Sequence, residues 1–217
     1  YLKSDGLQDQ AILYVADRLD GPARVLLDPN QFSTDRTVAL ADFEIGPGGR
    51  HVAYATSDGG SDWKTWRIRE VASGRDLPDE LGLTKFTEVA WAADGSGFYY
   101  SRYPAGGDGR GDDAKQVAIW YHALGTPQAG DRLVYAITDH PTRNPYPRTT
   151  DDGRYLVVAV SDGYDVNGYR YVDLKRSPVA TNGADAAAAD AVRLLDRWDA
   201  LYEFLGNRGR TFYFRTN

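Results

Sequence analysis

Residues 150–158 of the chain read TDDGRYLVV, and this stretch decides the fold class. A turn of Asp and Gly leads directly into aromatic and β-branched residues, which favour the half-buried, pleated surface of a strand. Three further stretches also join a Gly-containing turn to a strand: GPGGRHVAY at 46–54, ADGSGFYY at 93–100 and GNRGRTFYF at 206–214. The repeat is about 50 residues long, which is close to the four strands of one β-propeller blade.

Alternating apolar residues between turn residues predict strands along most of the chain. We expect them at 12–16, 24–27, 51–56, 65–71, 97–102, 118–124, 155–160, 169–174 and 211–215. Only 185–205 has a helical character, with four Ala at 186–189, although Trp198, Leu201, Tyr202 and Phe204 also fit a strand and the Ala run also fits a loop.

The repeat predicts an all-β fold, namely part of a seven-bladed β-propeller with about four to five blades' worth of four-stranded antiparallel sheets. A β-sandwich also has many short strands, but the regular long period favours the propeller. Both ends of the chain interrupt the pattern. We therefore expect residues 1–217 to be one partial propeller domain of a longer protein.

Composition restricts the partners. The 217 residues carry a net charge of −6 and have a pI of about 5.1, which argues against nucleic acid because a phosphate-binding surface needs an excess of Lys and Arg. No apolar run is long enough to span a membrane. The absence of Cys excludes disulfides, thiolate metal sites and a Cys nucleophile within these residues.

The sequence contains no pattern for a catalytic or metal site. The Gly-x-Ser-x-Gly elbow of serine hydrolases is absent, and His51, His122 and His140 fit structural or surface positions. Residues 162–168 have the composition of a calcium loop but lack its closing Glu, so a turn between two strands is favoured. We expect no catalytic residue, no metal and no cofactor in this chain.

A series of short strings resembles the propeller of the prolyl oligopeptidase family of serine peptidases. They are LLDPN at 26–30, TVAL at 37–40, GSDW at 60–63, LPD at 77–79, KF at 85–86, GFYYSRYP at 97–104, YHALGT at 121–126, DDGRY at 151–155 and FYFRTN at 212–217. Each string alone is weak evidence, whereas so many in the same order form a strong resemblance.

The resemblance implies a two-domain enzyme in which the propeller is inserted into an α/β-hydrolase that carries a Ser-His-Asp triad outside this chain. Such an endopeptidase hydrolyses short peptides on the carboxyl side of proline, and its propeller excludes folded proteins. The implied partners are short proline-containing peptides and the protein's own hydrolase domain, with no nucleic acid and no membrane. The family also implies a monomer in the cytoplasm, with a periplasmic or secreted bacterial protein as the alternative.

Four residues match substrate-facing positions of the family. Phe86 would offer an apolar surface to a residue upstream of the proline, although it also fits a core aromatic position. Tyr164 and Asn144 fall where some relatives have Cys and Met, and both also fit plain loop roles. Asp62 would tune the electrostatics of the site, but an Asp there also caps turns.

Two other classes remain open at this point. A non-catalytic propeller could serve as an interaction scaffold, which would need repeats that close a ring by themselves. A propeller glycosidase would need paired carboxylates that converge on the ring axis, whereas the Asp and Glu residues lie mainly in turns.

Overall fold

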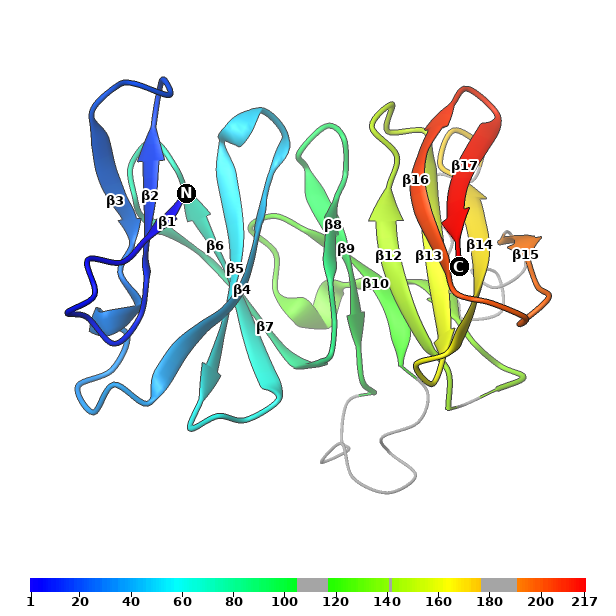
Figure 1. Ribbon diagram of the computed structural model, residues 1–217, viewed down its shortest axis with the longest axis horizontal. Helices are drawn as coiled ribbons and strands as arrows, with labels where there is room; N and C mark the ends of the chain where they lie inside the picture. The colour runs from blue at the N-terminus through cyan, green and yellow to red at the C-terminus, as the bar shows by residue number, and fades with distance from the viewer. Residues whose placement is uncertain (105–116, 141, 177–190) are drawn as a thin grey trace. The chain divides into compact units, whose positions relative to one another are not determined.

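A computed structural model describes residues 1–104, 117–140, 142–176 and 191–217 (Figure 1). In these residues the regular elements are β-strands and single turns of 3-10 helix. The chain forms two compact units, Tyr1–Gly82 and Leu83–Asn217.

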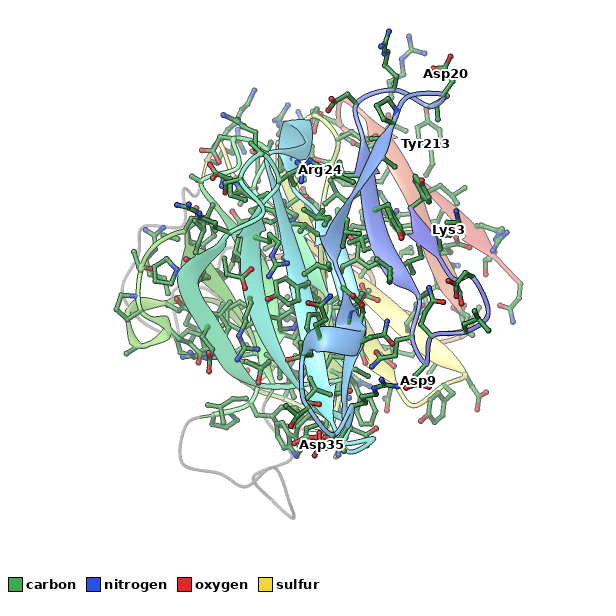
Figure 2. The ribbon with its side chains drawn as sticks, turned by 90° about the vertical axis from the view of Figure 1, so that its left-hand side faces the viewer. Lys3, Asp9, Asp20, Arg24, Asp35 and Tyr213 are labelled. Atoms are coloured by element: carbon green, nitrogen blue, oxygen red, sulfur yellow. The ribbon has the colours of Figure 1, made fainter. Side chains whose placement is uncertain are left out.

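The first unit contains two antiparallel sheets. The three-stranded sheet has the order β1 (Leu2–Lys3), β2 (Ile12–Ala16) and β3 (Ala23–Leu27), and the short helix η1 (Pro29–Gln31) follows it. The four-stranded sheet has the order β4 (Val38–Ile45), β5 (His51–Asp58), β6 (Trp63–Glu70) and β7 (Asp76–Lys85), with η2 (Pro47–Gly49) between β4 and β5. Charged side chains such as Lys3, Asp20 and Asp35 project from this unit (Figure 2).

The second unit contains two four-stranded sheets and one two-stranded sheet. The first sheet comprises β8 (Val89–Trp91), β9 (Gly97–Arg102), β10 (Ala118–Ala123) and β11 (Arg132–Ala136), with η4 (Gln128–Gly130) before β11. The second comprises β12 (Asn144–Thr149), β13 (Tyr155–Asp162), β14 (Val166–Asp173) and β15 (Val192–Leu195). The last comprises β16 (Tyr202–Arg208) and β17 (Thr211–Thr216).

In all five sheets, strands that follow one another in sequence pair antiparallel. All nine predicted strands are present, with β2 and β9 at the predicted bounds and the others shifted by one to three residues at an end. The helical interpretation of 185–205 is wrong for its described residues, because residues 192–195 form β15 and residues 202–205 begin β16. The strand alternative is confirmed for Tyr202 and Phe204, whereas Trp198 and Leu201 lie between the two strands. The four Ala at 186–189 lie outside the described residues.

The sequence analysis did not identify β12, because prolines at 145 and 147 argue against a strand. Proline cannot donate a backbone hydrogen bond and is tolerated at a sheet edge. β12 is such an edge, since it pairs only with β13 in its sheet. The strands β1, β4, β7, β8, β11, β15 and β16 were also not among the predicted ones.

Each unit has its own apolar core. In the first unit, Leu13, Leu26, Leu27, Val52 and Tyr54 pack between the two sheets. In the second unit, a buried cluster joins the sheets of β8–β11 and β12–β15. A second cluster there packs the aromatic residues of β16 and β17 against β13 and β14. Stacking of neighbouring sheets therefore covers faces that a single sheet would leave exposed.

Candidate functional site

Phe86 lies in a short segment between β7 and β8 and is directed outward. Its side chain is 55% exposed, whereas Thr84 and Thr87 on either side are 0% and 2% exposed. The Lys85 ammonium lies 5.0 Å from the centre of the Phe86 ring. The core interpretation of Phe86 is therefore wrong, and the ring is free to offer an apolar surface.

The backbone at the end of β7 and in this segment is unusual; residues 83–87 are called the segment from here on. Leu83 and Phe86 have φ values of 58° and 50°, in the left-handed region that bulky residues rarely adopt. The carbonyl oxygen of Leu83 accepts a hydrogen bond of 2.9 Å from the backbone N–H of Tyr103, just after β9. The segment is therefore tied to the sheet that follows it.

Asn144 and Tyr164 lie at the same end of the sheet β12–β15. Asn144 begins β12 and pairs with Ser161 of β13, and the Ser161 hydroxyl donates to the carbonyl oxygen of Gly163 at 2.6 Å. Tyr164 follows in the turn between β13 and β14 and is 95% exposed. The prediction that residues 162–168 connect two strands by a turn is confirmed for residues 163–165, since Asp162 already pairs with Val166.

Tyr146, which the sequence analysis did not identify, connects these elements. Burial raises its pKa, and the nearby Glu88, Tyr103 and Tyr164 raise the pKa further because their negative forms would repel a phenolate. Electrostatic effects of this kind act over short distances. The geometry agrees, because β12 lies against β8 and β9.

Asp62 belongs to the first unit, in the exposed turn between β5 and β6. This turn is held by a hydrogen bond from the N–H of Ser61 to the carbonyl oxygen of Asp58 and by one from the N–H of Trp63 to the Ser61 hydroxyl. Asp62 occupies the same place in its sheet, between the second and third strands, as Tyr164 does in its own.

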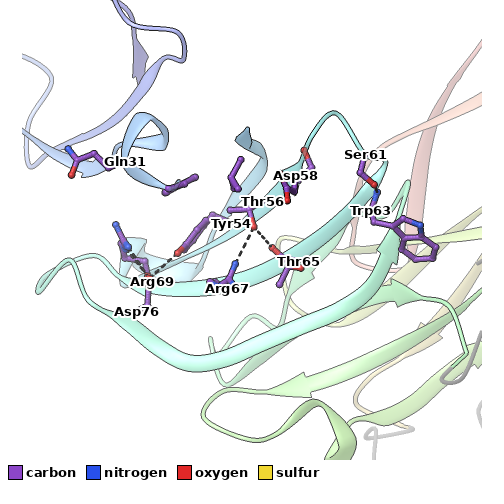
Figure 3. Close-up of a pocket in the computed structure, with 13 residues that line it drawn as sticks. Gln31, Tyr54, Thr56, Asp58, Ser61, Trp63, Thr65, Arg67, Arg69 and Asp76 are labelled. Carbon is purple, nitrogen blue, oxygen red and sulfur yellow. Dashed lines mark hydrogen bonds and ion pairs between the residues drawn. The ribbon is translucent and has the colours of Figure 1, made fainter. Parts of the chain in front are cut away.

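A polar cavity of about 590 Å³ adjoins this turn (Figure 3). Its walls come from η1 and the faces of β4–β7 and include Gln31, Phe32, Val38, Tyr54, Thr56, Ser57, Asp58, Ser61, Trp63, Thr65, Arg67, Arg69 and Asp76. The sequence analysis did not predict it, because its lining combines alternate residues of several strands.

Both arginines in the lining of this cavity form ion pairs, Arg67 with Glu80 and Arg69 with Asp76. Arg69 makes two hydrogen bonds to Asp76, of 2.7 and 2.9 Å, and donates a third to the carbonyl oxygen of Leu26. Asp76 also accepts from the hydroxyl of Tyr54 at 2.9 Å. Burial, followed by the carboxylate of Asp76, raises the pKa of Tyr54 to about 12. The cavity also offers hydroxyl groups, aromatic surface and the carboxylate of Asp58, which accepts a hydrogen bond from the Thr37 hydroxyl at 2.7 Å.

A His–Asp pair in the second unit has a hydrogen bond like that between the His and Asp of a catalytic triad. The pair is fully buried, however, as is typical of a structural pair. His122 Nδ1 lies 2.7 Å from Asp131 Oδ1, and the Tyr100 hydroxyl donates to Asp131 Oδ2 at 2.5 Å. The side chains of His122 and Asp131 are both 0% exposed. A substrate cannot reach them, so the prediction of a structural role for His122 is consistent with this burial.

His51 begins β5 and is half-buried, and His140 is exposed in the loop before β12. Within the described ranges, no group of three acidic or His side chains is arranged to hold a metal ion. No described helix is long and apolar enough to cross a membrane.

Successive four-stranded antiparallel sheets, each joined to the next along the chain and stacked within its unit, define a segment of a β-propeller. The family description "Prolyl oligopeptidase, N-terminal beta-propeller domain" matches residues 1–217. The chain therefore belongs to the prolyl oligopeptidase family, as its N-terminal propeller domain. This match leaves no part of the chain for a hydrolase domain.

Individual relatives agree with this assignment. A prolyl endopeptidase of Elizabethkingia meningoseptica is 32% identical over 100% of this chain and 29% of its own length. A prolyl oligopeptidase of Omphalotus olearius is 31% identical over 99% of this chain and 31% of its own length. The chain spans about a third of the length of these relatives.

Solved structures give the same result. A structure from a study of two prolyl endopeptidases matches with a TM-score of 0.83 and 31% identity, over 100% of this chain and 29% of that one. Prolyl oligopeptidase B of Galerina marginata matches with a TM-score of 0.83 and 28% identity, over 100% of this chain and 32% of that one. These matches confirm the predicted propeller and do not favour the sandwich.

Proposed function

We propose that this chain is the substrate-gating propeller of a serine endopeptidase that hydrolyses short peptides on the carboxyl side of proline. The nucleophile, the histidine and the acid of the triad would come from an α/β-hydrolase domain elsewhere in the full-length protein. The propeller would contribute no catalytic residue. It would exclude folded proteins and contact the substrate upstream of the proline.

The observation that carries the proposal is the exposed ring of Phe86 between two buried threonines, in a chain whose whole length matches this propeller domain. An exposed aromatic ring has apolar area that a substrate side chain could bury, at about 25 cal/mol per Å². Asn144 and Tyr164 would border the same subsite, because β12, which begins at Asn144, lies against β8, the strand that follows Phe86.

Asp62 would act from its own unit by its negative charge, which would favour substrates with a positive charge near the site. We also propose that the full-length protein is a monomer and lies in the cytoplasm. A periplasmic or secreted bacterial enzyme is the alternative. The interaction-scaffold function is not favoured, because the relatives reported above are prolyl endopeptidases and prolyl oligopeptidases.

Phe86→Ala in the full-length protein tests the proposal. Two chromogenic peptides would be compared, one with Phe and one with Gly immediately before the proline. We expect Phe86→Ala to raise KM for the Phe peptide by about fivefold to tenfold, which is the loss of one partly buried aromatic contact, and to leave kcat nearly unchanged.

Tyr213→Ala is the matched control, because Tyr213 is another exposed aromatic residue of the second unit, at 50% exposure (Figure 2). It should leave both peptides unaffected. Unchanged KM values for Phe86→Ala would remove Phe86 from the site. Efficient cleavage of a folded protein substrate by the wild type would contradict the gating role.

A further inference from the structure

Backbone strain is concentrated beside the proposed substrate contact. In the described part of the chain, four non-glycine residues have a positive φ: Arg36, Leu83, Phe86 and Trp198. Two of the four lie within four consecutive positions, 83–86. Leu and Phe have no side-chain polar group that could stabilise this conformation as Asn or Asp can.

One buried polar group of the segment is unsatisfied. Thr87 is 2% exposed, and its hydroxyl has no hydrogen-bond partner. Both features lower the stability of the folded state. Strained conformations of this kind persist only where the surroundings impose them, and they occur preferentially at sites that bind ligands.

The surroundings impose this conformation at both ends of the segment. The 2.9 Å hydrogen bond from the Tyr103 N–H fixes the carbonyl oxygen of Leu83, and Tyr103 itself is only 6% exposed. The buried side chains of Thr84 and Thr87 fix the following residues. Between these fixed points the φ angle of Leu83 sets the direction in which the chain reaches Phe86.

We propose that Leu83 is a positioning residue, whose left-handed backbone conformation holds the Phe86 ring exposed for a bulky substrate residue upstream of proline. This inference rests on the proposed function, since it takes the Phe86 ring as the substrate contact. Leu83 would not touch the substrate. Leu83 would act through its backbone. A substitution should therefore preserve the substrate preference when the new residue can adopt a positive φ, even if its side chain differs from Leu.

The test compares two substitutions at this position in the full-length protein. Leu83→Val introduces a β-branched residue, which disfavours positive φ, whereas Leu83→Asn introduces a residue that tolerates it. For Leu83→Val we expect the preference for the Phe peptide over the Gly peptide to fall by about fivefold, through a higher KM for the Phe peptide and an unchanged kcat. Leu83→Asn should retain the preference.

Arg36→Val is the matched control, because it also places a β-branched residue at a position with a positive φ. Arg36 has a φ of 60° in an exposed turn of the other unit, and its ion pair with Asp9 is exposed. This substitution should lower the melting temperature without changing the preference between the two peptides. Melting curves of all variants would verify that each one folds.

The outcomes separate the two proposals. An unchanged peptide preference in Leu83→Val, together with a reduced one in Phe86→Ala, would overturn the positioning role and leave the proposed function intact. An equal loss in Leu83→Val and Leu83→Asn would also overturn it, because the side chain and not the backbone would then be responsible. No loss in any variant, Phe86→Ala included, would remove Phe86 from the proposed substrate site and overturn the positioning role of Leu83 with it.

Discussion

The turns that precede β5 and β13 come from the same sequence repeat and have the same local geometry, but their surroundings differ. Gly48 and Gly153 have φ values of 67° and 63°. A Cβ at Gly48 would meet nothing within 4 Å, whereas a Cβ at Gly153 would lie 2.3 Å from the Cβ of Ala93. Ala93 belongs to the corresponding turn between β8 and β9.

In the second unit, the turns of this repeat contact one another from sheet to sheet. Gly153 packs on Ala93, and the Asn207 side chain of the β16–β17 turn donates to Asp152 Oδ2 at 3.1 Å. Figure 1 shows the three turns at one end of the unit. The repeat therefore specifies a turn in four of the five sheets, but the packing of neighbouring sheets decides that a Cβ is excluded at Gly153 and not at Gly48.

The fourth strand residue after these turns also differs between the two sheets. Tyr54 is the fourth residue of β5 and lines the polar cavity, whereas Val158, the fourth residue of β13, is 0% exposed in the apolar core. Tyr54 is itself buried in the core of the first unit, and its hydroxyl donates to Asp76 at the cavity. A single position of the repeat thus carries a polar group to a cavity in one sheet and is wholly apolar in another.

The largest expected effect comes from Gly153→Ala. It combines the cost of a left-handed Ala, about 1–2 kcal/mol, with overpacking of about 1–3 kcal/mol against Ala93. We expect a loss of about 2–5 kcal/mol in the free energy of unfolding, measured by urea denaturation of the full-length protein. Adding Ala93→Gly should restore the steric part, and failure of the double variant to recover would show that the clash is not the cause.

Gly48→Ala should have a smaller effect, because only the backbone cost applies. We expect a loss of about 1–2 kcal/mol in the same denaturation experiment. If the two glycine substitutions were equally destabilising, the difference in surroundings between the two turns would have no energetic meaning.

The smallest effect is expected for Tyr54→Phe, and it depends on pH. At neutral pH the loss of the hydrogen bond to Asp76 should cost about 1 kcal/mol. The pKa of Tyr54 is raised from 10.0 to about 12 in the folded protein. Its contribution to stability is therefore complete below pH 10 and is lost as the pH rises toward 12, because the unfolded state releases the proton first.

Melting temperatures of wild type and Tyr54→Phe between pH 8 and about pH 11.5 would check this prediction. The wild type should lose more stability than the variant over this range. Parallel curves would mean that Tyr54 ionises as it does in the unfolded chain and that the cavity is open to water at this position.

Much of the fold could be predicted because its determinants are local. The strands β2 and β9 are runs of apolar and aromatic residues next to turn residues, and this signal lies in residues that are adjacent in the sequence. Both strands were therefore predicted with their observed bounds. The strand β12 could not be predicted in this way, since its prolines are tolerated only because the strand is an edge.

The candidate site was only partly predictable. The resemblance indicated Phe86, Asn144, Tyr164 and Asp62, and their contact with substrate stays a prediction. Neither the strain at Leu83 nor the position of Tyr146 among Glu88, Tyr103 and Tyr164 has a signal in the sequence.

The sequence alone therefore determined the strand-forming segments, the glycine turns and the family, because these follow from local propensity and from the order of short motifs. Only the tertiary structure decided that Gly153 lies against Ala93, that Phe86 is exposed between buried threonines and that a polar cavity adjoins the turn of Asp62. The physical reason is that close packing depends on pairs of residues far apart in the chain, and local patterns do not specify which pairs meet.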